Sequence, residues 1–240
     1  MSLHHFPQIV SDSIEFYFDS RKIANYVGTS VTSVVGAKTL VATGVTRSGV
    51  TTTLTNANNS NNATSDISDS SYDSIFLNRA NITASVTFKQ TSLLDGSNPA
   101  HWRMTPFSFG LDGDKGMWGF EIFKDNLFYV RYNFNSSGTY GNELLITSDS
   151  FLNKWVNATF VNDGSKIKAY LNGVKVSEVS IADMTVTSSN ISRLSIGSQN
   201  RNGSKLYGFV GNVDTAIFYS RVLTDDEILK NAKNFLARCV

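Results

Sequence analysis

The chain has 240 residues, of which 41% are hydrophobic and 17% are charged, and its formal net charge at pH 7 is +1. One large β-sandwich can reach this length without splitting into domains, and its core needs no disulfide or metal for basic stability. The 21 basic and 20 acidic residues form no block of either sign. This balance argues against a nucleic-acid partner, which requires a basic footprint, and against a polybasic membrane attachment.

The sequence carries one cysteine, Cys239, and therefore predicts neither an intramolecular disulfide nor a zinc cluster. Its first residues, Met1 to Pro7, lack the basic start and apolar run of a signal peptide. No apolar stretch approaches the ~18 residues of a membrane span. These features favour a protein of a cytoplasm, or a particle that is assembled in one.

The N-terminal part divides into a polar segment and the start of a domain. Residues 1–13 are polar and irregular, and we expect them to form an arm ahead of a single domain over residues 14–240. A strand is predicted over residues 14–18, because apolar side chains alternate onto one face there. Residues 27–62 are rich in Gly, Thr, Ser and Asn and predict short strands and loops, with one strand at residues 51–55.

Strand-like alternation of apolar and polar residues becomes regular from residue 74 onward. Turn-forming residues separate the alternating segments, as in Asp112-Gly-Asp114-Lys-Gly116. The predicted strands span residues 84–88, 104–111, 117–123, 127–134, 155–161, 166–171, 193–196 and 209–219.

The clearest local signal is the Asn172-Gly173 pair, which predicts a two-residue hairpin turn because both positions of a type I′ turn need positive φ. Such a turn sets the register of the two strands that it joins. It predicts that Leu171 pairs with Val174 and Ala169 with Val176, all four on the face of Ile167.

One helix is predicted near the C-terminus. Thr224-Asp-Asp-Glu227 is a capping box, in which Thr224 caps the amide of Glu227 and Glu227 reaches back. Leu223 and Ile228 occupy the two positions of a hydrophobic staple. Ile228, Ala232, Phe235 and Leu236 then form an apolar stripe at helical spacing.

The order of these segments resembles the C-terminal half of laminin G-like, concanavalin A-like jelly-roll domains. The resemblance rests on Trp155 to Val176, Leu194-Ser-Ile-Gly197, Gly208-Phe-Val-Gly-Asn-Val-Asp214 and Tyr219 to Ile228. It implies an all-β jelly-roll sandwich of two antiparallel sheets with one short C-terminal helix. In such a fold Gly211 would let the last strand cross close to its neighbour.

The opening of the chain is similar to laminin G-like domains of tailed-bacteriophage virion proteins. The similar segments are Phe16-Tyr-Phe-Asp19, Ala24-Asn-Tyr26, Gly28-Thr29 and Thr53-Leu-Thr-Asn56. The sequence departs from that pattern where it carries Val31 to Thr39 in place of the usual Trp-x-Asp-x-Ser-Gly-x-Gly-Asn stretch. The resemblance implies a structural virion protein, such as a capsid decoration or head-fibre component.

Catalytic residues are not expected. Glycoside hydrolases that resemble this fold carry Glu-x-Asp-x-x-Glu on one strand, and retaining enzymes hold their two carboxyl groups about 5 Å apart. The glutamates at 15, 121, 143, 178 and 227 do not form this pattern, and the nearest pair, Glu121 with Asp125, is broken by a predicted turn. His4, His5 and His101 form no triad with a nucleophile elbow. The sequence therefore predicts a protein that is not an enzyme.

A calcium ion is the one cofactor that the sequence suggests. Many laminin G-like domains hold calcium at one rim through carboxylates and carbonyls, and Asp112 and Asp114 are the best candidates, with Asp69 and Asp73 as others. A simple hairpin turn, for which Asp and Gly are the preferred residues, is the favoured interpretation of the same stretch. The sequence therefore assigns no metal ligand.

Carbohydrate binding is the other common use of the fold, and it needs an exposed aromatic ring with hydrogen-bonding neighbours. Trp102, Trp118 and Tyr140 lie in or beside segments rich in Asn and Asp, and with Asp112 and Asp114 they form the predicted ligand-binding set. Trp118 is flanked by Gly116 and Gly119, and for this residue a place in the core is favoured over a ligand-binding one.

Two functions follow from these patterns. The first is a structural virion protein of a tailed phage that also tethers the particle to surface glycans, with the major capsid protein and other virion proteins as partners. Its arm, with His4, His5, Phe6 and Pro7, would bind another copy or a capsid lattice. The alternative is a stand-alone carbohydrate-binding, lectin-like module.

Overall fold

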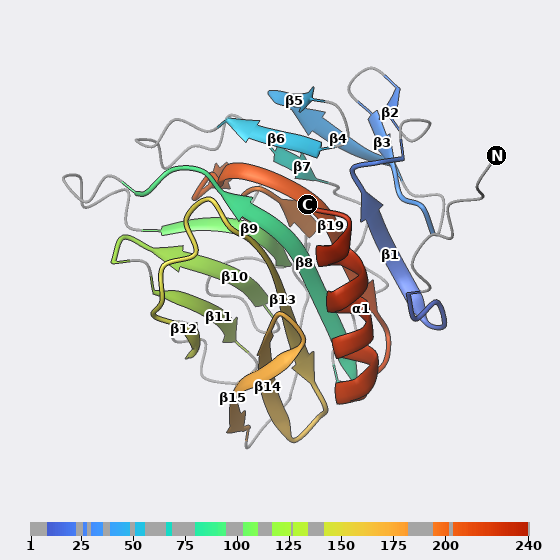
Figure 1. The fold of residues 1–240 in the computed structure, drawn as a ribbon, viewed down its shortest axis with the longest axis vertical. Helices are drawn as coiled ribbons and strands as arrows, with labels where there is room; N and C mark the ends of the chain where they lie inside the picture. The colour runs from blue at the N-terminus through green and yellow to red at the C-terminus, as the bar shows by residue number, and fades with distance from the viewer. Residues whose placement is uncertain are drawn as a thin grey trace.

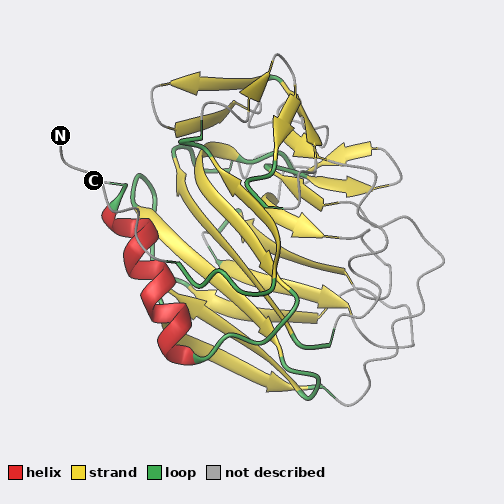
Figure 2. Cartoon of the chain, turned by 90° about the vertical axis from the view of Figure 1, so that its right-hand side faces the viewer, coloured by secondary structure: helices red, strands yellow, loops and turns green. Residues whose placement is uncertain are grey.

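In the computed structural model the described residues form two large antiparallel β-sheets, with one α-helix lying outside them (Figure 1; Figure 2). The structure describes residues 9–22, 26–27, 30–35, 39–48, 51–55, 66–68, 80–94, 103–109, 117–125, 127–133, 142–181, 194–201 and 204–239.

The first sheet, sheet A, carries the helix. Its strands are, in order, β15 (Val174–Ser180), β14 (Lys166–Leu171), β13 (Trp155–Asn162), β8 (Ile82–Gln90), β19 (Val210–Tyr219), β6 (Thr51–Thr55) and β5 (Val45–Ser48), and β1 (Ile14–Asp19) also pairs with β19.

The second sheet, sheet B, packs against the face of sheet A that is opposite to the helix. Its strands are, in order, β12 (Asn142–Thr147), β11 (Phe128–Asn133), β10 (Met117–Phe123), β9 (Arg103–Phe109), β16 (Leu194–Ile196), β7 (Asp66–Ser68), β4 (Thr39–Thr43), β3 (Ser30–Thr32) and β2 (Tyr26–Val27). A small hairpin of β17 (Gln199–Arg201) and β18 (Ser204–Leu206) follows β16. The predicted all-β sandwich of two antiparallel sheets is confirmed.

The core lies between the sheets because apolar residues alternate along the strands. On β8, for example, Ile82, Ala84, Val86 and Phe88 are buried in the main core cluster. Trp118 of β10 lies at the centre of this cluster, with its ring stacked at a centroid distance of 5.5 Å from Phe160 and 6.2 Å from Phe218. The predicted alternation of this part of the chain therefore corresponds to the inner face of each sheet.

The predicted hairpin forms, but its register changes two residue pairs before the turn. Asn172 and Gly173 both have positive φ, 52° and 85°, and Leu171 pairs with Val174 as predicted. A register shift between Ala169 and Tyr170 then pairs Ala169 with Ser177 instead of Val176. The predicted pairing of Ala169 with Val176 is wrong, because a β-bulge adds one residue to one strand and displaces every later pair.

The bulge also corrects the predicted apolar face of the hairpin. Val174 is 62% exposed and Val176 is 43% exposed, so neither is buried with Ile167. Val179 lies opposite Ile167 and packs against the core in their place.

The helix α1 (Asp225–Ala237) begins at the predicted capping box, since the Thr224 side chain accepts the Glu227 amide and the Glu227 side chain accepts the Thr224 amide. Its buried side, with Ile228 and Phe235, packs on the outer face of sheet A against residues that include Tyr170 and Tyr219. Leu223 joins this cluster, as a hydrophobic staple requires. No helix within the described residues has the length and apolar character needed to cross a bilayer.

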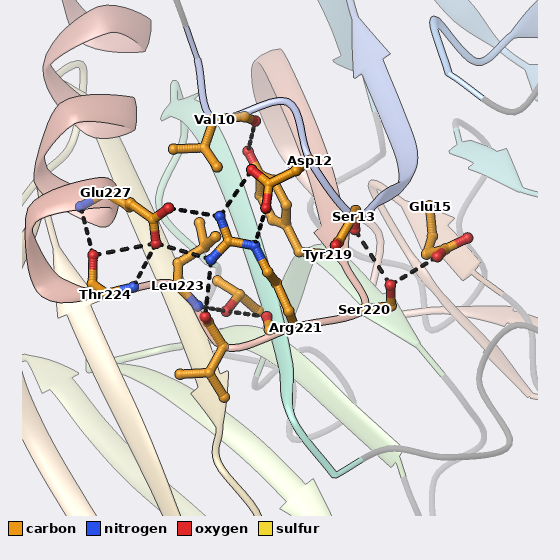
Figure 3. Close-up of polar contacts among 12 residues, drawn as sticks. Val10, Asp12, Ser13, Glu15, Tyr219, Ser220, Arg221, Leu223, Thr224 and Glu227 are labelled. Carbon is orange, nitrogen blue, oxygen red and sulfur yellow. Dashed lines mark hydrogen bonds and ion pairs between the residues drawn. The ribbon is translucent and has the colours of Figure 1, made fainter.

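Residues 9–13, which the sequence placed in the arm, contact the sandwich (Figure 3). The Val10 amide donates to Asn231 Oδ1 at 2.9 Å, and the Tyr219 hydroxyl donates to the Val10 carbonyl at 3.0 Å. Asp12 pairs with Arg221, with 2.7 Å between Oδ2 and Nε. His4, His5, Phe6 and Pro7 lie outside the described residues, so an arm over residues 1–8 stays a prediction.

Candidate functional site

Trp118 is the one residue of the predicted ligand-binding set that lies within the described part of the chain. Its exposed fraction is 0%, and aromatic rings from both sheets surround it. Stacking on a sugar requires a ring face that reaches the surface. Trp118 therefore belongs to the core, and its assignment as a ligand-binding residue is corrected. Trp102, Asp112, Asp114 and Tyr140 lie outside the described residues, and their roles stay predictions.

Metal binding by Asp112 and Asp114 also stays a prediction for the same reason. Among the residues that the structure describes, no three His, Cys, Asp or Glu side chains come together in a group that could hold a metal ion.

An aromatic pair on the outer face of sheet B is the feature that the sequence did not single out. Phe123 of β10 and Tyr129 of β11 are half-buried, and their ring centroids lie 5.1 Å apart with the planes at 77°. Tyr129 pairs across the sheet with Leu145 of β12, which is 41% exposed. These three side chains thus present partly exposed apolar surface on the side of the sheet that faces away from the core.

A charge cluster of Arg103, Glu121 and Arg131 lies beside this aromatic pair, on the same face of neighbouring strands. Arg103 Nη1 lies 2.9 Å from Glu121 Oε2, and Arg131 Nη1 lies 3.6 Å from the same oxygen. All three residues are buried. Because buried charges are retained only where ion pairs and hydrogen bonds compensate their desolvation, this cluster holds β9, β10 and β11 in a fixed relation.

Tyr207 packs against this charge cluster. The Arg103 guanidinium carbon lies 3.7 Å from the centroid of the Tyr207 ring, which is cation–π geometry. Tyr207 has a φ of 55°, a left-handed conformation that costs a bulky residue energy. The backbone holds it there through the Thr105 amide, which donates to the Tyr207 carbonyl at 2.9 Å. Strained residues of this kind are common at binding sites.

The adjoining hairpin is pinned to sheet B by Lys205. Its ammonium pairs with Asp66 of β7, a carboxylate that is fully buried, and also donates to Thr43 Oγ1 at 3.2 Å. The hairpin that carries Tyr207 at its end is therefore fixed to two strands of the sheet.

Two ionisable groups border the aromatic pair. Glu143 is exposed and lies directly opposite Arg131. Desolvation raises the pKa of its carboxyl, and the positive charge of Arg103 opposes this rise. Desolvation also raises the pKa of the Tyr129 phenol, as do the charges of Glu143 and Asp125. Tyr129 thus keeps its proton as a donor, beside the carboxyl group of Glu143.

This region, which we call the sheet B site, consists of Phe123, Tyr129, Glu143 and Leu145 with the charge cluster and Tyr207 behind them. It combines a partly exposed aromatic surface with polar groups that can fix the orientation of a ligand. The signal was present in the sequence, since Tyr129 and Arg131 occupy the positions opposite to the core-facing Phe128, Val130 and Tyr132.

The family model of the concanavalin A-like lectin/glucanases superfamily, in its laminin G form, matches residues 59–229, more than half of the chain. The chain belongs to this family. The predicted resemblance to laminin G-like, concanavalin A-like domains is therefore confirmed. No curated protein sequence matches the chain.

Solved structures share the fold of this laminin G-like domain at low sequence identity. Trypanosoma rangeli sialidase in complex with sialic acid has a TM-score of 0.67 and 14% identity, over 96% of this chain and 34% of that one. The CBM40 of Ruminococcus gnavus IT-sialidase bound to α2,3-sialyllactose has a TM-score of 0.51 and 16% identity, over 62% of this chain and 81% of that one. A leech intramolecular trans-sialidase has a TM-score of 0.51 and 15% identity, over 64% of this chain and 23% of that one.

The laminin G-like domain thus spans about a third of the length of the trypanosomal sialidase and less than a quarter of the leech protein. Likeness at this level of identity concerns the fold alone.

Proposed function

We propose that this laminin G-like domain is a carbohydrate-binding module and that the sheet B site is its binding surface. The observation that carries the proposal is the half-buried Phe123–Tyr129 pair, which lies outside the core beside the exposed carboxylate of Glu143. A sugar ring can stack on such rings while its hydroxyls donate to the carboxylate. Membership of a lectin/glucanase superfamily supports this use, as does the fold shared with a CBM40 solved with sialyllactose.

A glycan array, with and without calcium, tests the proposal. We expect binding that the Tyr129→Ala variant weakens roughly 10-fold, because one aromatic contact is worth ~0.5–1.5 kcal/mol beyond the area that it buries. Val174→Ala, on the exposed end of β15, is the control and should bind as the wild type does. Absence of binding to any glycan under both conditions contradicts the proposal.

We also propose that the domain binds without turnover. Glu121, the nearest approach to a catalytic carboxylate, is buried against two guanidinium groups, and Asp125 is exposed in the turn after β10. A hydrolase needs a second carboxyl group close to the first across the scissile bond. Release of reducing sugar from a bound glycan, abolished by Glu121→Gln, would contradict this proposal.

The setting that we propose is the virion of a tailed phage, assembled in the host cytoplasm, in which the domain serves as a capsid decoration or head-fibre component. The phage-like opening, Phe16-Tyr-Phe-Asp19, supports this setting. Residues 9–13 support it as well, because their contacts with Asn231 and Arg221 fix the point from which residues 1–8 depart. The partners would be the major capsid protein and further copies of this chain.

Deletion of residues 1–8 tests this setting better than deletion of residues 1–13. The shorter deletion keeps Val10 and Asp12, which contact Asn231 in the middle of α1 and Arg221 ahead of it, so that the domain stays folded. We expect the truncated protein to bind glycans and to lose its attachment to capsids. Unchanged capsid attachment would contradict the proposed role of residues 1–8 as an attachment arm. A protein that never attaches to capsids would favour the stand-alone lectin-like module.

A further inference from the structure

The outer face of sheet A carries a row of polar side chains beyond the part that α1 buries. Trp155 of β13 lies opposite Lys89 of β8, Lys89 opposite Asn212 of β19, and Asn212 opposite Thr53 of β6. Residues paired in this way share one face of a sheet. All four are half-buried, whereas Tyr170 and Tyr219 of the same face are buried beneath the helix.

We call these four residues the sheet A row. Both of its ends carry side chains of the kinds that contact glycans. The Lys89 ammonium lies 5.4 Å from the centroid of the Trp155 ring, within cation–π range. Asn212 Nδ2 donates to Thr53 Oγ1 at 2.8 Å. A side-chain amide has two N–H donors and a carbonyl acceptor, so this one bond leaves Asn212 capacity for a ligand.

The neighbouring positions on this face are polar as well, but they are buried beside the row and only support it from within. The Asn157 amide donates to Thr87 Oγ1 at 2.9 Å, and Thr215 Oγ1 donates to the same oxygen at 2.9 Å. The core of a protein–protein interface is apolar and poor in charge. The half-buried row itself offers one hydroxyl, one amide, one ammonium and one indole, which fit a polyhydroxylated chain better than a protein.

The length and charge of the row restrict the class of ligand that it can bind. Adjacent strands lie ~4.8 Å apart, so the three steps from Trp155 to Thr53 span roughly 14 Å, enough to contact more than one sugar. Lys89 is the charged member of the row. Its flexible stem lets the ammonium move from the indole face to a carboxylate while the ring accepts a sugar.

We infer that the sheet A row is a second carbohydrate-contact surface, which takes a glycan chain containing carboxylate-bearing sugars. The inference rests on the proposed function, since it assigns a second surface and a ligand class to a carbohydrate-binding domain. The two surfaces lie on opposite outer faces of the sandwich. One chain could then bridge two glycans, and the pair would raise avidity on a dense glycan layer.

Calorimetric titration of the full chain with oligogalacturonic acid and with its methyl ester tests the inference, because esterification removes the charge and keeps the rings. We expect the acid to bind at least tenfold more tightly than the ester. Lys89→Gln should abolish this difference, and Trp155→Ala should weaken both ligands. Tyr129→Ala, in the sheet B site, should leave the tenfold preference intact.

The outcomes separate this inference from the proposed function. The role of the sheet A row in carbohydrate binding is overturned by equal affinity for acid and ester. It is also overturned by an acid preference that Lys89→Gln leaves unchanged. Glycan binding that only Tyr129→Ala removes overturns the row and keeps the sheet B site. Absence of any glycan binding overturns both. Circular dichroism of each variant verifies its fold, and Lys89→Gln, at a half-buried surface position, carries the test should Trp155→Ala not fold.

Discussion

Arg221 and Glu227 form an ion pair across the turn between β19 and α1, with 2.6 Å between Nη2 and Oε1 (Figure 3). The same guanidinium pairs with Asp12 through Nε. Glu227 also closes the capping box, because its carboxylate accepts the Thr224 amide at 2.8 Å. One arginine therefore joins the N-terminal segment, the last strand and the first turn of the helix.

The stability of the protein should depend on pH through this pair. The hydrogen bonds from Arg221 lower the pKa of Glu227 from 4.5 to about 2, although desolvation opposes them. A carboxyl group whose pKa is lower in the folded state stabilises the fold fully above its unfolded pKa. The contribution of Glu227 is thus present above about pH 4.5 and is lost as the pH falls towards about 2.

Thermal unfolding of Arg221→Gln between pH 2 and pH 7 measures this contribution. We expect the variant to lose roughly 1 kcal/mol at pH 7, typical of a partly exposed ion pair, and to converge on the wild type near pH 2. Lys233→Gln, an exposed change on α1, is the control. A loss that is equal at both ends of the pH range would show that the Glu227 charge is not involved.

Gly211 should tolerate no side chain. A Cβ atom built at this position would lie 2.1 Å from the Lys89 carbonyl oxygen and 2.8 Å from the Phe209 ring. Gly211→Ala is expected to cost more than ~3 kcal/mol, as steric clashes with backbone in a core do. Gly164→Ala is the matched control, since its φ is +89° but its nearest neighbour lies at 3.9 Å. Equal losses in urea denaturation would contradict the prediction.

The elements that could be predicted from sequence are those whose cause is local. The Asn172-Gly173 turn and the Thr224–Glu227 cap depend on a few adjacent residues, and both form as predicted. The close approach of Gly211 to its neighbour, expected from the resemblance, is present too. Local backbone preference and capping chemistry are sufficient for such features.

The features that escaped prediction depend on distant strands. The alternation of apolar and polar residues along the strands does not reveal the bulge at Ala169 and Tyr170. The pairing beyond the bulge could therefore not be derived from the sequence. The sheet B site joins Phe123 to Tyr129 and Arg103 to Glu121, and strand order in the folded sheet brings these side chains together. For Trp118 the sequence leaves a ligand-binding place and the core as alternatives and favours the core, and tertiary packing places it there.

Substitutions at Tyr207 can separate the backbone strain at this residue from the contribution of its ring to glycan binding. Tyr207→Gly removes the cost of the left-handed backbone, whereas Tyr207→Ala removes the ring and keeps that cost. The glycine variant should therefore be more stable than the alanine variant by roughly 1 kcal/mol. Both variants should bind glycans more weakly than the wild type, because both lose the contact of the ring with Arg103. Equal stability of the two variants would show that the backbone at this position carries no strain.

Trp118 and Trp155 should respond in opposite ways to the same substitution. Trp118→Phe leaves a cavity among stacked rings, so its free energy of unfolding should fall by roughly 1–3 kcal/mol. Its affinity for glycans should not change, since no part of the side chain reaches the surface. Trp155→Phe, at a half-buried position, should lose little stability and should weaken the binding of oligogalacturonic acid. Urea denaturation and calorimetric titration of both variants decide this, and weaker glycan binding by a fully stable Trp118→Phe would return that residue to the ligand-binding set.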